Sequence, residues 1–231
     1  MAYKRIDGRK ADEMREIRAE VGVVPRADGS ALFAFGDTIA IAAVYGPKQF
    51  HPQHLQNPEK GVLRCTYDML SWSVAERKRP GPSRRSSEIS KVISWALSPV
   101  VQLDAFPNTV IDLFVYVLQA AASTRCAGIN AATLALAHAG VPMKDFVSAV
   151  SVGIVDNTII VDMTKDEEDV EGATDIPLAF LNRSGKVSLF QLDGKVSAAK
   201  LKEAIEMARE ACKKIYEMQK STLKAIKTNK K

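Results

Sequence analysis

The sequence predicts an α+β fold in which a mixed β-sheet with β-α-β units packs on helices. Three observations lead to this class. Pairs of β-prone runs recur along the chain, helical patterns separate them, and a long helical pattern closes the chain. We expect residues 1–231 to form a single domain, because no linker and no short-period repeat divides them.

The first third of the chain predicts an arm followed by three strands. Residues 1–20 are rich in charge and are expected to form the arm. Ala31–Phe35 and Thr38–Tyr45 are small, β-branched or aromatic, and the Gly36-Asp37 pair between them is typical of a hairpin turn. After a proline-rich loop, Val62–Trp72 predicts a further strand.

Two helices and one strand are predicted in the middle of the chain. Ser86 or Ser87 can cap the first helix, whose apolar residues recur at spacings of three and four up to Val101. Residues 110–118 are strongly β-prone. A turn then leads into an alanine-rich helix that ends at Gly140.

The last third of the chain predicts two hairpins and a closing helix. The runs that pair in these hairpins are 146–155 with 158–163, and 176–181 with 187–192. The closing helix begins near Ser197 and has one apolar face. We expect its lysine-rich end to fray from Lys213, with residues 220–231 as a basic tail.

The composition is typical of a globular protein with an anionic partner. The net charge is +5 and the sequence pI is about 9.0, which favours nucleic acid, although charge alone does not establish it. Three cysteines without metal-binding spacing indicate reduced thiols in a cytoplasmic protein. We expect no membrane association, because we find no signal-peptide core and no apolar run of about 18 residues.

An acidic stretch, Asp162–Asp175, stands out in this basic chain. It holds seven carboxylates and one lysine within fourteen residues. Such a run is either a hydrated loop or a place that gathers cations. Asp169 and Asp175 flank Gly172 and can converge if the loop turns between them. A carboxylate pair of this kind can bind Mg²⁺, or one member can act as a general acid.

Ser123, Thr124 and Arg125 form a candidate anion site where a β-prone run meets the alanine-rich helix. Free amides at a helix start, a hydroxyl and a guanidinium together suit phosphate or a similar oxyanion. The alternative interpretation is a hydroxyl cap beside a surface arginine.

A second basic feature is the Pro/Gly-rich loop 77–85, which holds five basic residues and no acid. It can follow a nucleic-acid backbone, or it can be a hydrated charged loop. Arg84 and Arg85 are the more informative pair, because they lie close to a predicted helix start.

Taken together, these stretches resemble the RNase PH family of phosphorolytic exoribonucleases, and within it the catalytic RNase PH-like subunit of the archaeal exosome. The resemblance runs from Arg5 to about Gln219 and rests on many short motifs in the family's order. These motifs are Arg5-Ile-Asp-Gly-Arg9, Ala27-Asp-Gly-Ser-Ala31, Ala42-Ala-Val-Tyr-Gly-Pro47, Glu76-Arg-Lys-Arg-Pro-Gly-Pro-Ser-Arg-Arg-Ser86, Phe106-Pro-Asn-Thr-Val-Ile-Asp112, Val117-Leu-Gln119, Ala131-Ala-Thr-Leu-Ala-Leu-Ala137, Ala139-Gly-Val-Pro-Met143 and Gly172-Ala-Thr-Asp175. The resemblance implies the RNase PH fold, in agreement with the predicted α+β class.

The resemblance also implies a phosphate site and a catalytic pair. Ser123, Thr124 and Arg125 fall where the family binds inorganic phosphate, its co-substrate. Asp169 and Asp175 match the family's two active-site aspartates. Asp175 would be the catalytic one, and the pair would be able to hold Mg²⁺.

Further positions match the family's RNA contacts. Arg84 and Arg85 fall in an arginine pair that contacts RNA and phosphate, and Arg64 matches an arginine that contacts the RNA backbone. The chain departs from the family pattern at Ala121 and Ser123, where the family has Asp and Gly. We expect Ser123 to crowd a backbone that approaches phosphate closely.

The activity implied by the resemblance is phosphate-dependent 3′→5′ degradation of single-stranded RNA, which releases nucleoside diphosphates. The implied assembly is a hexameric ring with a non-catalytic paralogue and RNA-binding cap subunits. Two alternatives stay open. Ala121 and Ser123 favour a non-catalytic, RNA-binding ring subunit. The acidic stretch favours a metal-dependent hydrolytic RNase, although no histidine spacing typical of a metal site supports it.

Overall fold

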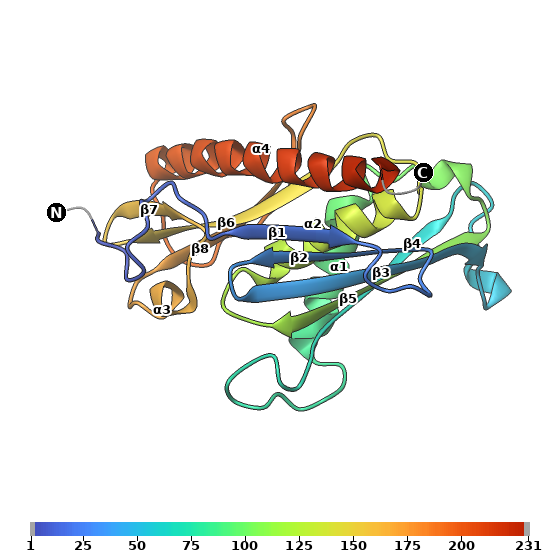
Figure 1. Cartoon of the computed structure of the whole chain (residues 1–231), viewed down its shortest axis with the longest axis horizontal. Helices are drawn as coiled ribbons and strands as arrows, with labels where there is room; N and C mark the ends of the chain where they lie inside the picture. Colours follow the sequence, from blue (N-terminus) through green and yellow to red (C-terminus); the bar gives the residue numbers. More distant parts are fainter. Residues whose placement is uncertain (1–2, 229–231) are drawn as a thin grey trace.

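The structure, a computed structural model, describes residues 3–228, with side chains described up to residue 225. Its strands form two sheets, and its helices pack on them (Figure 1). The α+β class predicted from the sequence is confirmed. The strands, however, divide into one mixed and one antiparallel sheet instead of a single mixed sheet.

The first sheet has the strand order β1-β2-β3-β5-β4. Its strands are β1 (Ile17–Val21), β2 (Gly29–Phe35), β3 (Thr38–Gln49), β4 (Val62–Met69) and β5 (Thr109–Gln119). β4 and β5 are parallel and are joined through α1 (Arg84–Leu97), which is a predicted β-α-β unit. The other pairs are antiparallel, and the β2–β3 hairpin turns at the expected Gly36-Asp37 pair. Short 3₁₀ turns lie at Gln53–Leu55 and Leu103–Ala105.

The second sheet has the order β7-β6-β8-β9 and is antiparallel throughout. Its strands are β6 (Val147–Val155), β7 (Thr158–Val161), β8 (Thr174–Leu181) and β9 (Val187–Phe190). Both predicted hairpins are therefore present. The acidic stretch between β7 and β8 is not only a loop, since it contains a short helix, α3 (Lys165–Glu168).

The helix α2 (Thr124–His138) packs against β2 and β3 of the first sheet and β6 of the second. It is buried on nearly all sides, as its alanine-rich sequence requires. The close approach of α2 to β2 depends on small residues, because a Cβ on Gly29 of β2 would lie only 2.4 Å from the carbonyl oxygen of Ala135 on α2. One apolar core therefore runs through both sheets, and the N-terminus of α2 lies close to the second sheet.

The ends of two helices differ from the sequence prediction. α1 begins at Arg84 with Ser83 as its cap, three or four residues before the predicted cap, because Ser83 and Ser86 form a reciprocal capping box. α4 (Ala198–Thr228) was expected to fray from Lys213, but the helix continues through Thr228 (Figure 1). Its later turns remain ordered because side chains such as Ile215 and Gln219 are buried. Residues 229–231 of the predicted tail lie outside the described residues.

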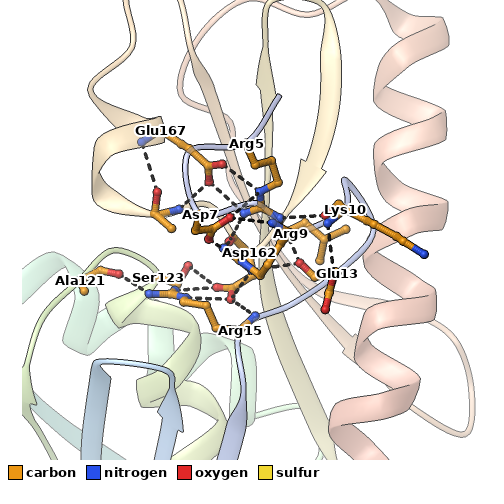
Figure 2. A network of polar contacts seen from close by, with 12 residues as sticks. Arg5, Asp7, Arg9, Lys10, Glu13, Arg15, Ala121, Ser123, Asp162 and Glu167 are labelled. Atoms are coloured by element: carbon orange, nitrogen blue, oxygen red, sulfur yellow. Dashed lines mark hydrogen bonds and ion pairs between the residues drawn. The ribbon is translucent and has the colours of Figure 1, made fainter. Parts of the chain in front are cut away.

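The prediction of an N-terminal arm was wrong. Residues 17–21 form β1, which pairs with β2 along its whole length. The preceding residues dock on the second sheet through Arg5, which is 3% exposed (Figure 2). Arg5 makes a two-pronged ion pair with the buried Glu167, with Nε–Oε1 at 2.8 Å and Nη2–Oε2 at 2.9 Å. Its Nη1 and Nη2 also donate to the carbonyls of Val161 and Asp162. The charge of Arg5 is thus fully paired within the protein.

The structure shows the state of the three cysteines and the length and polarity of the described helices. Cys65, Cys126 and Cys212 are free thiols, and the last two are buried. Burial raises the pKa of the Cys65 thiol to about 12. Within residues 3–228, no helix is long and apolar enough to cross a membrane.

We predict that Arg5→Met strongly destabilises the protein, because Glu167 is left charged and buried without its partner. The loss should be about 3–5 kcal/mol of the free energy of unfolding, measured by urea denaturation. Arg18→Met is the matched control, since Arg18 is an exposed arginine on β1, and it should change stability by less than about 0.5 kcal/mol. Equal losses in the two variants would contradict the role given to the buried pair.

Candidate active site

A cleft with two adjoining lobes opens beside the N-terminus of α2. The lobe next to α2, here the α2 lobe, has a volume of about 460 Å³, and the neighbouring acidic lobe has about 520 Å³. The residues that line both lobes are Arg85, Arg125, Lys165, Glu168, Asp175 and Pro177. Three cations and two carboxylates therefore face one space, as expected of a site that handles phosphate groups.

The N-terminus of α2 supplies the anion-binding part of the cleft. Residues 123–126 line the α2 lobe. The first helical hydrogen bond runs from the Ala127 amide to the Ser123 carbonyl, so the amides before Ala127 have no acceptor within the helix. These amides, together with the positive end of the helix dipole, suit a phosphate.

The predicted phosphate residues take different roles in this lobe. The Ser123 hydroxyl donates to Asp162 Oδ1 at 3.2 Å and so points its proton away from a ligand. Arg125 donates from Nη1 to the Gln191 amide oxygen, and its buried Nε has no partner among the described residues. Thr124 lies beside the buried phenol of Tyr67, whose pKa is raised by burial and whose hydroxyl has no hydrogen-bond partner among the described residues.

The predicted RNA-contacting arginines separate into two groups. Arg85 lines both lobes, whereas Arg84 lies on the exposed surface at the start of α1 and lines neither lobe. Arg64 lies outside the cleft on β4, where Nε is 2.6 Å and Nη2 2.9 Å from the Asp112 carboxylate. Burial raises the pKa of Asp112, but hydrogen bonds from Arg64 and Lys48 outweigh it and hold this pKa below the ordinary value.

The two predicted aspartates both line the acidic lobe, but their surroundings differ. Asp175, at the start of β8, is half-buried and accepts a hydrogen bond from the Ser151 hydroxyl. Burial is the main cause that raises its pKa. Asp169 has a side chain that is 62% exposed and pairs with Lys165 Nζ at 2.5 Å. Asp175 is therefore the better placed of the two for chemistry.

Two further acids of the acidic stretch, for which the sequence left a hydrated loop open, are at least half-buried. Glu168 is half-buried and lines both lobes, and its pKa is raised by burial and by the charge of Asp175. Glu167 is fully buried against Arg5. The missed signal was the Thr164-x-x-Glu167 capping box, which predicts a short helix and points Glu168 back toward the cleft. Asp162, the first residue of the acidic stretch, is fully buried and paired with Arg15.

The cleft fits a metal ion only in part. Within residues 3–228, no group of three or more His, Cys, Asp or Glu side chains is placed to hold a metal. Mg²⁺ bound to a nucleotide site commonly takes one or two carboxylates and completes its shell with substrate phosphates and water. Asp175 with Asp169 or Glu168 meets that smaller requirement.

Comparison with known proteins identifies the class. The chain belongs to the 3′ exoribonuclease family: the model of its RNase PH domain 1 matches residues 13–142, and that of its domain 2 matches residues 145–211. The family assignment made from the sequence is thereby confirmed.

Among individual proteins, the chain is similar to archaeal exosome complex components named Rrp41. It is 50% identical to that of Thermococcus kodakarensis over 221 residues, which covers 96% of this chain and 88% of the relative. It is 48% identical to that of Methanopyrus kandleri over 220 residues, which covers 95% and 92%. These similarities extend over nearly the whole of both chains.

Solved structures show the same fold. Rice Rrp46 superposes with a TM-score of 0.84 at 28% identity, and the match covers 95% of this chain and 100% of that one. A chain of the Archaeoglobus fulgidus exosome with RNA bound to the active site gives a TM-score of 0.79 at 22% identity, covering 93% and 92%. At this identity, the second likeness shows the fold alone.

We predict that Arg85→Ala lowers phosphate-dependent turnover far more than Arg84→Ala. Arg85 faces both lobes, and removing a cation aimed at reacting phosphate costs about 10²–10³-fold in rate. Arg84 lines neither lobe, so its loss should weaken RNA binding by about tenfold or less. Steady-state kinetics with varied phosphate and RNA tests this, and equal loss of turnover in the two variants would contradict the assignment.

Proposed function

We propose that this chain is the catalytic, phosphate-dependent 3′→5′ exoribonuclease subunit of an exosome-like ring. One observation carries the proposal: the free amides of α2, Arg85, Arg125 and Asp175 line a single cleft. Membership of the 3′ exoribonuclease family and similarity to exosome components supply the reaction class.

In the proposed reaction, inorganic phosphate is the nucleophile. It binds at the N-terminus of α2, and one of its oxygens attacks the phosphorus of the last phosphodiester of the RNA. A new P–O bond forms, the bond to the 3′-oxygen of the preceding nucleotide breaks, and a nucleoside diphosphate leaves. Arg85 and Arg125 neutralise the negative charge that gathers between the two phosphates.

Asp175 is the proposed proton donor to the departing 3′-oxygen. Burial raises its pKa, which favours the protonated form that such a donor requires. The Ser151 hydroxyl binds one of its oxygens and fixes its orientation. Asp169, at the outer edge of the same lobe, is proposed to assist through charge and not through proton transfer.

A Mg²⁺ ion is compatible with this cleft as a shared ligand of protein and substrate. Asp175 together with Asp169 or Glu168 would hold it, and phosphate oxygens and water would fill the remaining positions. When bound, it would neutralise phosphate charge.

The proposed partners follow from the exosome relatives and from the charge of this chain. They are single-stranded RNA, a non-catalytic RNase PH-like paralogue in a hexameric ring, and RNA-binding cap subunits, with the complex in the cytoplasm. Arg64 and Arg84 lie outside the cleft and are proposed to contact the RNA backbone on its way to Asp175.

A non-catalytic ring subunit is the second candidate, because Ala121 and Ser123 depart from the family pattern. The cleft argues against it, since its amides, arginines and Asp175 are all in place. A hydrolytic RNase is less well supported, because the α2 amides, Arg85 and Arg125 suit inorganic phosphate as the nucleophile.

We predict that Asp175→Asn lowers the rate of nucleoside diphosphate release at least about 10²-fold, because the amide cannot donate the proton. Asp169→Asn should retain about a tenth or more of the wild-type rate, since Asp169 is exposed. The assay uses 3′-labelled single-stranded RNA with the chain alone and in its ring, with and without phosphate.

Three outcomes of this assay separate the candidates. Phosphate-dependent diphosphate supports the proposal. Nucleoside monophosphate formed without phosphate would point to a hydrolase. An assembled ring that binds RNA and releases nothing would identify a non-catalytic subunit.

A further inference from the structure

The loop that leads into α2 has an unfavourable backbone conformation. Ala122 and Ser123 have φ values of +63° and +55°, in the left-handed region that residues with a Cβ avoid. Two such residues in succession persist only where the surrounding structure holds them. The contacts that hold this loop come from outside the cleft.

Thr38, the first residue of β3, holds the backbone of the loop. Its hydroxyl donates to the Ala122 carbonyl at 2.7 Å and accepts from the Ala121 amide at 3.1 Å. It accepts a third hydrogen bond from Arg15 Nη1 at 3.3 Å. A hydroxyl has one donor and two acceptor positions, so all are occupied, and Thr38 is 0% exposed. The Thr38 hydroxyl therefore holds the loop and has no hydrogen-bonding position left to bind substrate.

Asp162 and Arg15 hold the loop from its other side, as Figure 2 shows. The Ser123 hydroxyl donates to Asp162 Oδ1. Arg15 binds the same carboxylate, with Nε–Oδ2 at 2.8 Å and Nη2–Oδ1 at 2.6 Å, and its Nη1 donates to the Ala121 carbonyl. Each residue from 121 to 123 is thus bound to Thr38, Arg15 or Asp162.

We propose that Thr38, Arg15 and Asp162, here called the loop frame, are positioning residues that set the affinity for phosphate. The loop frame fixes residues 121–123 so that the amides at the start of α2 face the bound ion. Ser123 then binds phosphate through its backbone amide, because its hydroxyl proton is committed to Asp162. This inference rests on the proposed phosphate site and adds residues that touch no substrate.

The loop frame explains how serine is tolerated at position 123 with a positive φ. Glycine enters the left-handed region without a steric penalty, whereas serine does not. In this chain the hydrogen bond to Asp162 offsets that penalty. The hydroxyl is therefore needed only because a Cβ is present at position 123.

Comparison of Ser123→Ala with Ser123→Gly in the full chain, in its active assembly, tests the inference. Alanine keeps the Cβ and loses the bond to Asp162, so the KM for phosphate should rise about tenfold, which corresponds to about 1.4 kcal/mol. The glycine variant loses the hydrogen bond to Asp162 but also loses the steric penalty of the left-handed conformation. Its KM for phosphate should therefore rise at least about threefold less than that of the alanine variant. The KM for RNA should change less than about twofold in both variants. Equal rises for alanine and glycine would show that the hydroxyl contacts phosphate directly and would overturn the inference.

Thr38→Val and Thr38→Ser form an independent pair. Valine removes all three hydrogen bonds at nearly constant volume and should raise the KM for phosphate about tenfold, while serine keeps the hydroxyl and should restore most of the affinity. Thermal unfolding identifies any variant that has lost its fold. A rise in the KM for RNA equal to that for phosphate, in a folded Thr38→Val variant, would overturn the inference.

Titration of inorganic phosphate by calorimetry separates this inference from the proposed function. If Ser123→Ala weakens phosphate binding more than Ser123→Gly does, but the chain shows no phosphorolysis, the loop frame is supported and the enzyme assignment is rejected. If the chain performs phosphorolysis but the two Ser123 variants bind phosphate equally well, the enzyme assignment stands and the loop frame is rejected.

Discussion

The ion pair between the buried Asp162 carboxylate and Arg15 is the interaction on which this structure depends. Asp162 lies at the end of β7 in the second sheet, is fully buried, and accepts hydrogen bonds from Arg15 and from Ser123 at the start of α2. Its own amide donates to the Ser151 carbonyl, and the Ser151 hydroxyl in turn binds Asp175. A buried charge must be paired to be tolerated, so Arg15 and Ser123 are held in fixed positions around Asp162.

The cleft is built by complementary contributions from the two sheets. The helices α1 and α2 supply the α2 amides, Arg85 and Arg125, and α3 adds the third cation, Lys165. The second sheet supplies the carboxylates on α3 and β8. The N-terminal segment joins them, because Arg5 binds Glu167 of α3 while Arg15 binds both Asp162 and the loop before α2 (Figure 2). Arg85 and Arg125 therefore face the same cleft as Glu168 and Asp175.

The sequence predicted most of the elements because their signals are local. β-prone runs and the Gly36-Asp37 turn predicted the first hairpin, helical spacing predicted α1, and an alanine-rich run ending at Gly140 predicted α2. The site residues Arg85, Arg125 and Asp175 came from family motifs, and the cleft brings them together. The pairing of Arg5 with Glu167 was not predicted, because burial of this ion pair depends on a contact between residues 162 positions apart that no local pattern records. The same holds for Asp162, whose partner Arg15 lies 147 residues away.

The most direct test of this account is a crystal structure of the chain with bound phosphate or with tungstate as a heavier substitute. The account predicts the anion within hydrogen-bonding distance of the amides in the first turn of α2 and of the Arg85 and Arg125 guanidinium groups. It also predicts that the Ser123 hydroxyl remains on Asp162. An anion bound only at Arg64 on the outer strand, or a Ser123 hydroxyl turned from Asp162 onto the anion, would contradict the account.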